Sequence, residues 1–337
     1  MGMATKKRLE LKLPIPTRFK HPMPLPLPLP PKERGSDHFV LAGPVQRKLD
    51  VTSMHKEMAE LIRQAQSSDL ERLGILGHGS GGTVYKVLHR KSSSHYALKV
   101  VRLDHDRYIM REAEILKKIN SPFIVKCEGI FEEGGSINFV LEYMDGGSLA
   151  NLLKHKKRMS ESFIANAAAQ VLKGLKYLHG ERIVHRDIKP SNLLMNRNSQ
   201  VIKIADFGVS RVVSQSMDTV SCNSYVGTCA YMSPERFDPD SYGGSYNGYA
   251  GDVWSFGLSM LECYVGYFPF LAPGQKADWA TLMCAICFGD PPCAPPGSSA
   301  QFRSFIGCCL QKDPSNRWTP SQLLNHPFLT EFMHRFK

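Results

Sequence analysis

The sequence of 337 residues predicts an α+β chain of two lobes behind a basic arm, with a β-rich first lobe and an α-helical second lobe. From residue 70 to residue 142, short apolar segments alternate with turn residues, as antiparallel strands do. After Gly146-Gly147, the apolar residues recur with helical spacing. Segregation of strands and helices in this order is typical of an α+β fold, with the two glycines as the hinge.

The composition excludes several classes of protein. Apolar residues make up 42% and charged residues 22% of the chain, which is typical of globular proteins and not of a fully disordered chain or a fibre. No segment has the 18 or more uncharged apolar residues of a transmembrane helix, and the N-terminus lacks the apolar core of a signal peptide. We therefore expect no membrane partner and a cytoplasmic location, with the nucleus as a second location.

The net charge of +11 is concentrated near the N-terminus. Residues 1–68 hold 12 basic and 6 acidic residues, and eight prolines fall within residues 14–31. Such a segment cannot form helix or sheet ladders, so we predict a disordered arm over residues 1–68, with a short helical patch at 54–65. A basic surplus fits nucleic acid, a membrane surface or an acidic protein, and composition cannot choose among them.

The nine cysteines indicate thiols in a reducing compartment. Cys284, Cys287, Cys308 and Cys309 could be combined into a zinc site. The first two lie in an apolar helical run, where free cysteine usually packs as a small hydrophobe, so core packing is favoured.

The two-lobed domain is predicted over residues 69–329, divided into lobes 69–144 and 145–329, with a tail at 330–337. Its first lobe should contain strands and one helix, in this order: strands 73–77, 84–88 and 95–102, helix 108–118, strands 123–131 and 137–142. The clearest helices of the second lobe are 148–154, 162–179, 253–265, 279–288 and 302–311.

A glycine-rich segment with Gly77, Gly79 and Gly82 follows the first strand and precedes Val84. A strand follows it instead of a helix, which counts against a dinucleotide-binding unit. Glycines in such a hairpin let backbone N–H groups approach phosphate oxygens, although an ordinary hairpin turn explains the pattern equally well.

Lys99 ends an apolar strand, where its charge would be desolvated unless it meets an anion. The next helix offers Glu112 and Glu114. Glu112 has Leu116 one helical turn later, whereas Glu114 has Lys118, so Glu112 should face inward and pair with Lys99.

Two polar clusters follow apolar segments: His185-Arg-Asp187-Ile-Lys189-Pro-Ser-Asn192 and Asp206-Phe-Gly208. Phosphoryl transfer requires an anion cradle, a hard cation on oxygen ligands and a group that orients the acceptor hydroxyl. Asn192 and Asp206 supply metal-binding oxygens, Asp187 the base or positioning carboxylate, and Lys189 a cation for the transferred phosphoryl group.

These motifs in this order resemble the eukaryotic protein kinase family over about residues 70–330. The resemblance implies a bilobal kinase fold that uses ATP and Mg²⁺, with Leu141 as gatekeeper, Asp252–Gly257 in a buried helix and Arg317 paired with Glu235. It also implies that the nucleotide site comprises Leu76, Gly77, Gly79, Gly82, Val84, Ala97, Lys99, Glu142, Met144 and Leu194.

Residues 206–211 and 225–236 are similar to those of mitogen-activated protein (MAP) kinase kinases. The segments starting at Trp279 and His326 fit best with the compact plant group. The resemblance implies an enzyme that phosphorylates Thr and Tyr in a downstream MAP kinase, after activation by a MAP kinase kinase kinase. A Ser/Thr kinase of an adjacent tier and a docking scaffold with residual activity remain as alternatives.

Two regulatory expectations follow from this resemblance. Lys6, Lys7 and Arg8 followed by Leu11 and Leu13 resemble a docking motif, whose cations would meet an acidic patch and whose leucines would enter a groove of the MAP kinase. A solvated terminus or a nuclear-import signal is the alternative. The charge of the arm then needs no nucleic-acid partner.

The activation segment departs from the usual plant spacing of five residues between two phosphorylated positions. Position counted from each end of the segment gives Ser216 and Ser224, which seven residues separate. Phosphate at these residues could order the loop by pairing with Arg186.

Overall fold

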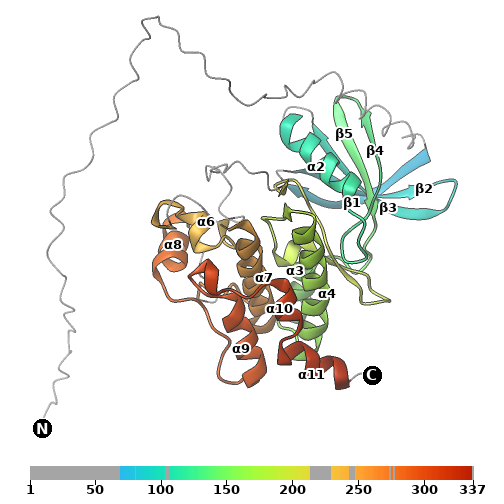
Figure 1. Cartoon of the computed structure of the whole chain (residues 1–337). Coiled ribbons are helices and arrows are strands. Elements are labelled where there is room, and N and C mark those ends of the chain that lie inside the picture. Colours follow the sequence, from blue (N-terminus) through green and yellow to red (C-terminus); the bar gives the residue numbers. More distant parts are fainter. Residues whose placement is uncertain are drawn as a thin grey trace, which may run out of the picture. The chain divides into compact units, whose positions relative to one another are not determined.

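The computed structural model describes residues 69–79, 81–102, 106–212, 229–242, 247–272, 275 and 278–335 (Figure 1). Within these residues a β-rich lobe precedes a helical lobe, so the predicted fold class is confirmed. Among the described helices, none is long and apolar enough to cross a membrane.

The first lobe is an antiparallel five-stranded sheet of order β1-β2-β3-β5-β4 with one helix, α2. Its elements are β1 (Leu70–Gly79), β2 (Gly82–His89), β3 (Ser94–Arg102), α2 (Asp106–Lys118), β4 (Cys127–Glu133) and β5 (Ser136–Glu142). The prediction of a strand from residue 123 was wrong for its first four residues. Phe123 and Val125 there exchange backbone hydrogen bonds with Ile204 of the second lobe instead of pairing within the sheet.

The register divides the side chains of this sheet between two faces. Directly opposed residues lie on the same face, so Val84, Lys99 and Phe139 share one face across three strands. The other face carries a separate apolar cluster of Val87, Leu98, Phe131 and Val140. The first face is the one that meets α2 and the second lobe, because Phe139 belongs to the main hydrophobic core.

The second lobe contains the helices α3 (Leu149–Lys156), α4 (Glu161–Gly180), α6 (Pro234–Phe237), α7 (Gly248–Val265), α8 (Trp279–Met283), α9 (Ala300–Cys309), α10 (Pro320–Leu324) and α11 (Pro327–Arg335). Helix α7 is buried on nearly all sides and packs against α4 and α9. It begins five residues before its predicted start, because the Asn247 side chain caps the N–H groups of Tyr249 and Ala250.

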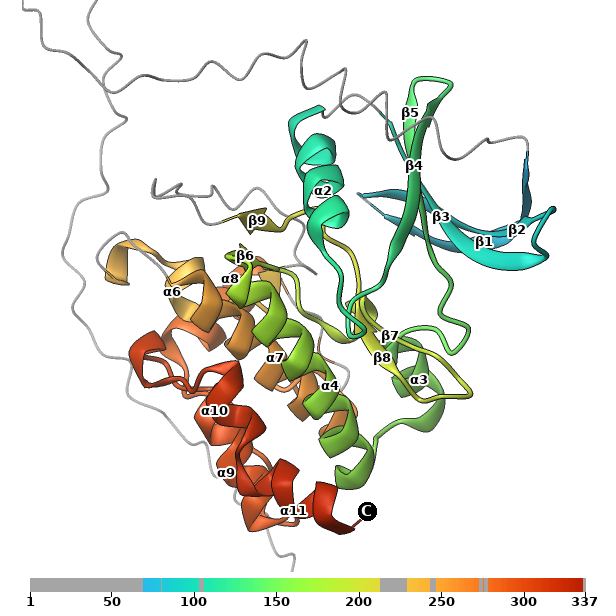
Figure 2. The same cartoon turned by 45° about the vertical axis from the view of Figure 1, so that its right-hand side comes forward.

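Two short antiparallel strand pairs, of which the second is a hairpin, position the polar clusters between the sheet and the helices (Figure 2). Strand β6 (Ile183–Val184) pairs with β9 (Arg211–Val212), and β7 (Leu193–Met195) pairs with β8 (Ile202–Ile204). The one-turn helix η3 (Pro190–Asn192) leads directly into β7. Sequence periodicity did not reveal these strands, since two or three residues are too few to show a period.

The helix predicted over residues 279–288 is divided in two. After α8 the chain widens into a π-helix, Cys284–Phe288, in which Gly289 N–H donates to Cys284 O at 2.9 Å. Cys287 is half-buried, but Cys284 is exposed, so the predicted core packing was wrong for Cys284. The wider turn changes which side chains of this segment face inward.

Candidate active site

Lys99 on β3 lies at the centre of a cluster of buried charges. Its Nζ donates to Glu112 Oε1 at 2.7 Å and to Asp206 Oδ1 at 2.9 Å. Lys99 and Glu112 are buried, whereas Glu114 is exposed, so the predicted choice of Glu112 as the partner is confirmed. The pair joins the sheet to α2, and the second bond joins the first lobe to the second.

Burial and charge act in opposite directions on these groups. Burial acts to lower the pKa of Lys99, but Asp206 and Glu112 raise it above its ordinary value. Burial acts to raise the pKa of Asp206, and the Lys99 ammonium outweighs it and lowers this pKa to about 2. Burial raises the pKa of Glu112 in spite of the neighbouring ammonium. Lys99 therefore stays charged, and Asp206 stays ionised at neutral pH.

Asp187 follows β6 and lies among the other polar residues of the first cluster. Its Oδ2 accepts hydrogen bonds from Asn192 Nδ2 at 2.9 Å and from Lys189 Nζ at 2.9 Å. Burial raises the pKa of Asp187, while the charge of Lys189 acts to lower it. The structure thus brings all three predicted residues of this cluster together around one carboxylate.

Buried Asp252 of α7 fixes the backbone that carries this cluster. Its carboxylate accepts from the N–H of His185 at 2.9 Å and of Arg186 at 2.7 Å. His179 of α4 adds a third contact, from Nε2 at 3.0 Å. The burial of α7 agrees with the prediction from the sequence, whereas the contact of His179 with Asp252 was not predicted.

The glycine-rich segment forms the β1–β2 hairpin. Gly82 has φ +104°, and a Cβ there would lie 2.1 Å from Val100 O, so this glycine is required by the hairpin itself. At Gly77 and Gly79, a Cβ would meet no atom of the described residues within 4 Å. These two glycines therefore leave open space beside the backbone, as a phosphate cradle requires.

The predicted adenine residues lie on one face of the sheet and on the segment that leaves it. Ala97 is opposite Leu141 in the register and shares the face of Lys99 and Val84. Leu76 is the extra residue of a bulge in β1, between Ile75 and Gly77.

The other predicted adenine contacts lie at the end of β5, in the connection that follows it (residues 143–147), and on β7. The buried Met144 donates its N–H to no acceptor among the described residues, so this group is free for a ligand. Leu194 lies on β7 opposite Lys203. The Glu142 side chain binds Lys203 Nζ at 2.7 Å from both oxygens and so is not free for a nucleotide.

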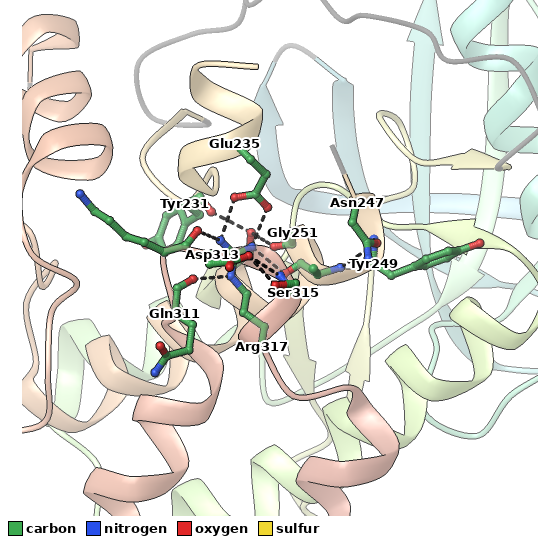
Figure 3. A network of polar contacts seen from close by, with 12 residues as sticks. Tyr231, Glu235, Asn247, Tyr249, Gly251, Gln311, Asp313, Ser315 and Arg317 are labelled. Carbon is green, nitrogen blue, oxygen red and sulfur yellow. Dashed lines mark hydrogen bonds and ion pairs between the residues drawn. The ribbon is translucent and has the colours of Figure 1, made fainter. Parts of the chain in front are cut away.

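Glu235 and Arg317 form the predicted ion pair deep in the second lobe. The guanidinium Nη1 and Nη2 lie 2.6 and 2.7 Å from the two carboxylate oxygens, and both side chains are 0% exposed (Figure 3). Their contact confirms the prediction and ties α6 to the segment before α10.

Several predicted residues lie outside the described part of the chain. These are Ser216 and Ser224, and the docking residues Lys6, Lys7, Arg8, Leu11 and Leu13. Their assignments stay predictions.

The model of the protein kinase domain family matches residues 70–329. Mitogen-activated protein kinase kinase 9 of Arabidopsis thaliana is 60% identical over 269 residues, which cover 78% of this chain and 85% of the relative. Mitogen-activated protein kinase kinase 7 of the same plant is 55% identical over 295 residues, covering 86% and 94%.

The chain belongs to the mitogen-activated protein kinase kinases. A more distant member, mitogen-activated protein kinase kinase 2 of Arabidopsis thaliana, is 42% identical over 295 residues, covering 84% of this chain and 79% of the relative. The protein is therefore a protein kinase of the plant group that the sequence motifs resemble. Membership in this enzyme family implies the use of ATP.

Proposed function

We propose that this MAP kinase kinase transfers the γ-phosphoryl group of ATP to both the Thr and the Tyr of a MAP kinase activation loop. The observation that carries the proposal is the pair of charged clusters, Lys99–Glu112–Asp206 and Asp187–Lys189–Asn192, which are close enough for the charge of Asp206 to act on Asp187. The glycine-rich hairpin adjoins the first cluster, since a Cβ on Gly81 would lie 3.6 Å from Lys99 Cε. The identity of the substrate rests on the family relationship.

The residues present fit Mg²⁺, which would neutralise charge that develops on the phosphates. Asn192 uses its amide nitrogen to bind Asp187, so its oxygen is the atom available to a cation. Asp206 presents a second oxygen ligand that is ionised at neutral pH, and 45% of its side chain is accessible. Hard oxygen ligands of this kind suit Mg²⁺.

The protein groups would act mainly by positioning and by electrostatic stabilisation. Lys99 would orient the phosphates, and Asp187 would accept or orient the proton of the substrate hydroxyl. Lys189, 2.9 Å from Asp187, would place its charge beside the transferred phosphoryl group. The N–H of Met144 and the backbone of Glu142 would contact the adenine edge, over the apolar Leu76, Val84, Ala97 and Leu194.

Regulation would involve two parts of the chain. We propose that a MAP kinase kinase kinase activates the enzyme by phosphorylating Ser216 and Ser224, and that the arm holds the MAP kinase through Lys6, Lys7, Arg8, Leu11 and Leu13. A substrate of this kind is consistent with action in the cytoplasm and the nucleus.

The test is incubation of the purified full chain with ATP, Mg²⁺ and a panel of MAP kinases that carry an inactivating substitution. Phospho-Thr and phospho-Tyr are scored separately on each substrate. We expect both on at least one MAP kinase, and none with Asp187→Asn. Phospho-Thr alone would favour a Ser/Thr kinase of an adjacent tier. Substantial activity of Asp187→Asn would overturn the role of Asp187.

The docking role is tested by reversal of the charges of Lys6, Lys7 and Arg8. We expect a lower rate on the intact MAP kinase and an unchanged rate on a peptide that contains only its activation loop. Reversal of Arg47 and Lys48 in the same arm is the control. An unchanged rate on the intact MAP kinase would reject the docking motif.

A further inference from the structure

The side chain of Glu142 connects three segments of the molecule. Glu142 is the last residue of β5, and both of its carboxylate oxygens accept from Lys203 Nζ of β8 at 2.7 Å. Its Oε2 also accepts from the backbone N–H of Lys126, just before β4, at 3.2 Å. The carboxylate thus links the end of the sheet to a strand of the second lobe.

Lys203 is a fixed partner and not a mobile surface lysine. It lies between the buried residues Ile202 and Ile204 of β8, and its side chain is only 16% exposed, against 31% for Glu142. The backbone of Ile204 is itself bonded to Phe123. A bidentate contact in a partly buried setting is screened less by water than an exposed ion pair.

The same β7–β8 hairpin also holds the other end of the connection between the lobes. Gly146 N–H donates to Met195 O at 2.9 Å, and Met195 N–H donates to Gly147 O at 2.8 Å. The segment 142–147 is therefore bonded to β8 at its start and to β7 at its end. Figure 2 shows this hairpin next to α3, where the connection enters the second lobe.

The hairpin also carries the two proposed metal ligands. Asn192 immediately precedes β7, and Asp206 follows β8 by two residues. Ala205 N–H donates to Asn192 O at 2.9 Å, which ties the two ends of the hairpin together. One small element therefore positions both the adenine end and the phosphate end of the proposed nucleotide site.

We propose that the Glu142–Lys203 pair is a positioning element. It holds residues 142–147 in the geometry for nucleotide binding and at a fixed position relative to Asp206. The proposal rests on the proposed function for the placement of adenine at residues 142–144. Among these contacts of residues 142–147, the Glu142–Lys203 ion pair is made by side chains, so it can be removed without altering the backbone. Its loss should loosen the connection at β5 and weaken ATP binding, while Lys99 and Asp187 keep their partners.

The experiment compares Glu142→Gln and Lys203→Met with Lys126→Met as the matched control. The Lys126 side chain is 61% exposed and pairs with Glu128, and the hydrogen bonds of Lys126 with Glu142 are made by its backbone. For the first two variants we expect KM for ATP to rise roughly three- to tenfold, with kcat within about twofold of wild type. Lys126→Met should behave as wild type.

Two further measurements separate positioning from a merely structural role. The dissociation constant of a non-hydrolysable ATP analogue should rise in parallel with KM, and the charge-exchanged double variant Glu142→Lys/Lys203→Glu should recover part of the loss. Unchanged nucleotide affinity in both single variants would overturn the proposal. So would a loss confined to kcat, or one that follows a lowered melting temperature. Nucleotide binding is measured without a protein substrate, so the absence of phosphorylated MAP kinase would count against the proposed function alone.

Discussion

Two buried charged centres of this kinase differ in how completely their charges are satisfied. In the second lobe, Arg317 pairs with Glu235, and its remaining donors reach the carbonyl oxygens of Ala250, Gln311 and Lys312. In the candidate active site, the single ammonium of Lys99 is shared by the carboxylates of Glu112 and Asp206. The first centre is neutral and closed, whereas the second has excess negative charge.

The difference separates a structural ion pair from one that we propose acts in catalysis. Both side chains of the Glu235–Arg317 pair are 0% exposed, so no ligand can reach them. Asp206 remains accessible and has φ +68°, a strained conformation for a residue other than glycine. A cluster with surplus negative charge and an open side attracts a cation, which suits a proposed metal site.

The largest effect is expected from Lys99→Met. The variant should lose phosphoryl transfer by about a thousandfold or more, because the phosphates lose their fixed cation. The fold should remain, since Glu112 already has a raised pKa and can be protonated when its partner is lost. Single-turnover transfer and the melting temperature are the measurements. Activity within tenfold of wild type would contradict the role of Lys99.

Breaking the Glu235–Arg317 pair should lower stability, whereas breaking the Lys99 cluster should lower activity. Arg317→Met is expected to lower the free energy of unfolding by about 3–5 kcal/mol, because it leaves the Glu235 carboxylate buried without a partner. Chemical denaturation measures this change, and replacing Glu235 by Leu in the same chain should restore part of it. The control Lys91→Met removes an exposed pair with Asp69 and should change little. A small change in the free energy of unfolding of Arg317→Met would contradict the structural role of the Glu235–Arg317 pair.

The sequence predicted those parts of the site that depend on local pattern. The choice of Glu112 over Glu114 needed only the residue one helical turn away. The same desolvation argument that identified Lys99 also applies to Lys203, which lies in the apolar run Val201-Ile-Lys-Ile-Ala, and it could have revealed a buried ion pair there. It could not have named Glu142, which is 61 residues away in the chain.

Other features depend on tertiary contacts that no local pattern encodes. Residues 123–125 have the apolar character of a strand, but Phe123 and Val125 bond to Ile204, and β4 begins only at Cys127. The π-helix after α8 exposes Cys284, although a regular helix was the natural expectation for this apolar run. At residues 123–125, bonding to a distant segment outweighs the local preference.

A smaller effect distinguishes two glycines of one hairpin. Gly82→Ala should lower the free energy of unfolding by about 1–3 kcal/mol, because φ +104° and the nearby Val100 O both oppose a Cβ. Gly79→Ala should leave stability unchanged and raise KM for ATP, because the added methyl group would meet no atom of the described residues but would meet a bound nucleotide. Thermal unfolding and ATP titration of the two variants give the comparison. Equal destabilisation would show that the open space at Gly79 has no functional meaning.

The smallest effect concerns the pH dependence of kcat/KM. Asp187 must be ionised to accept a proton, so kcat/KM should fall as the pH drops through its pKa, which burial raises above the ordinary value. Lys189 acts to lower this pKa, so Lys189→Met should move the acidic limb of the profile to higher pH, independently of any loss in maximal rate. A limb that stays in place in Lys189→Met would mean that another group controls it, and Asp187 would then lose its role as proton acceptor.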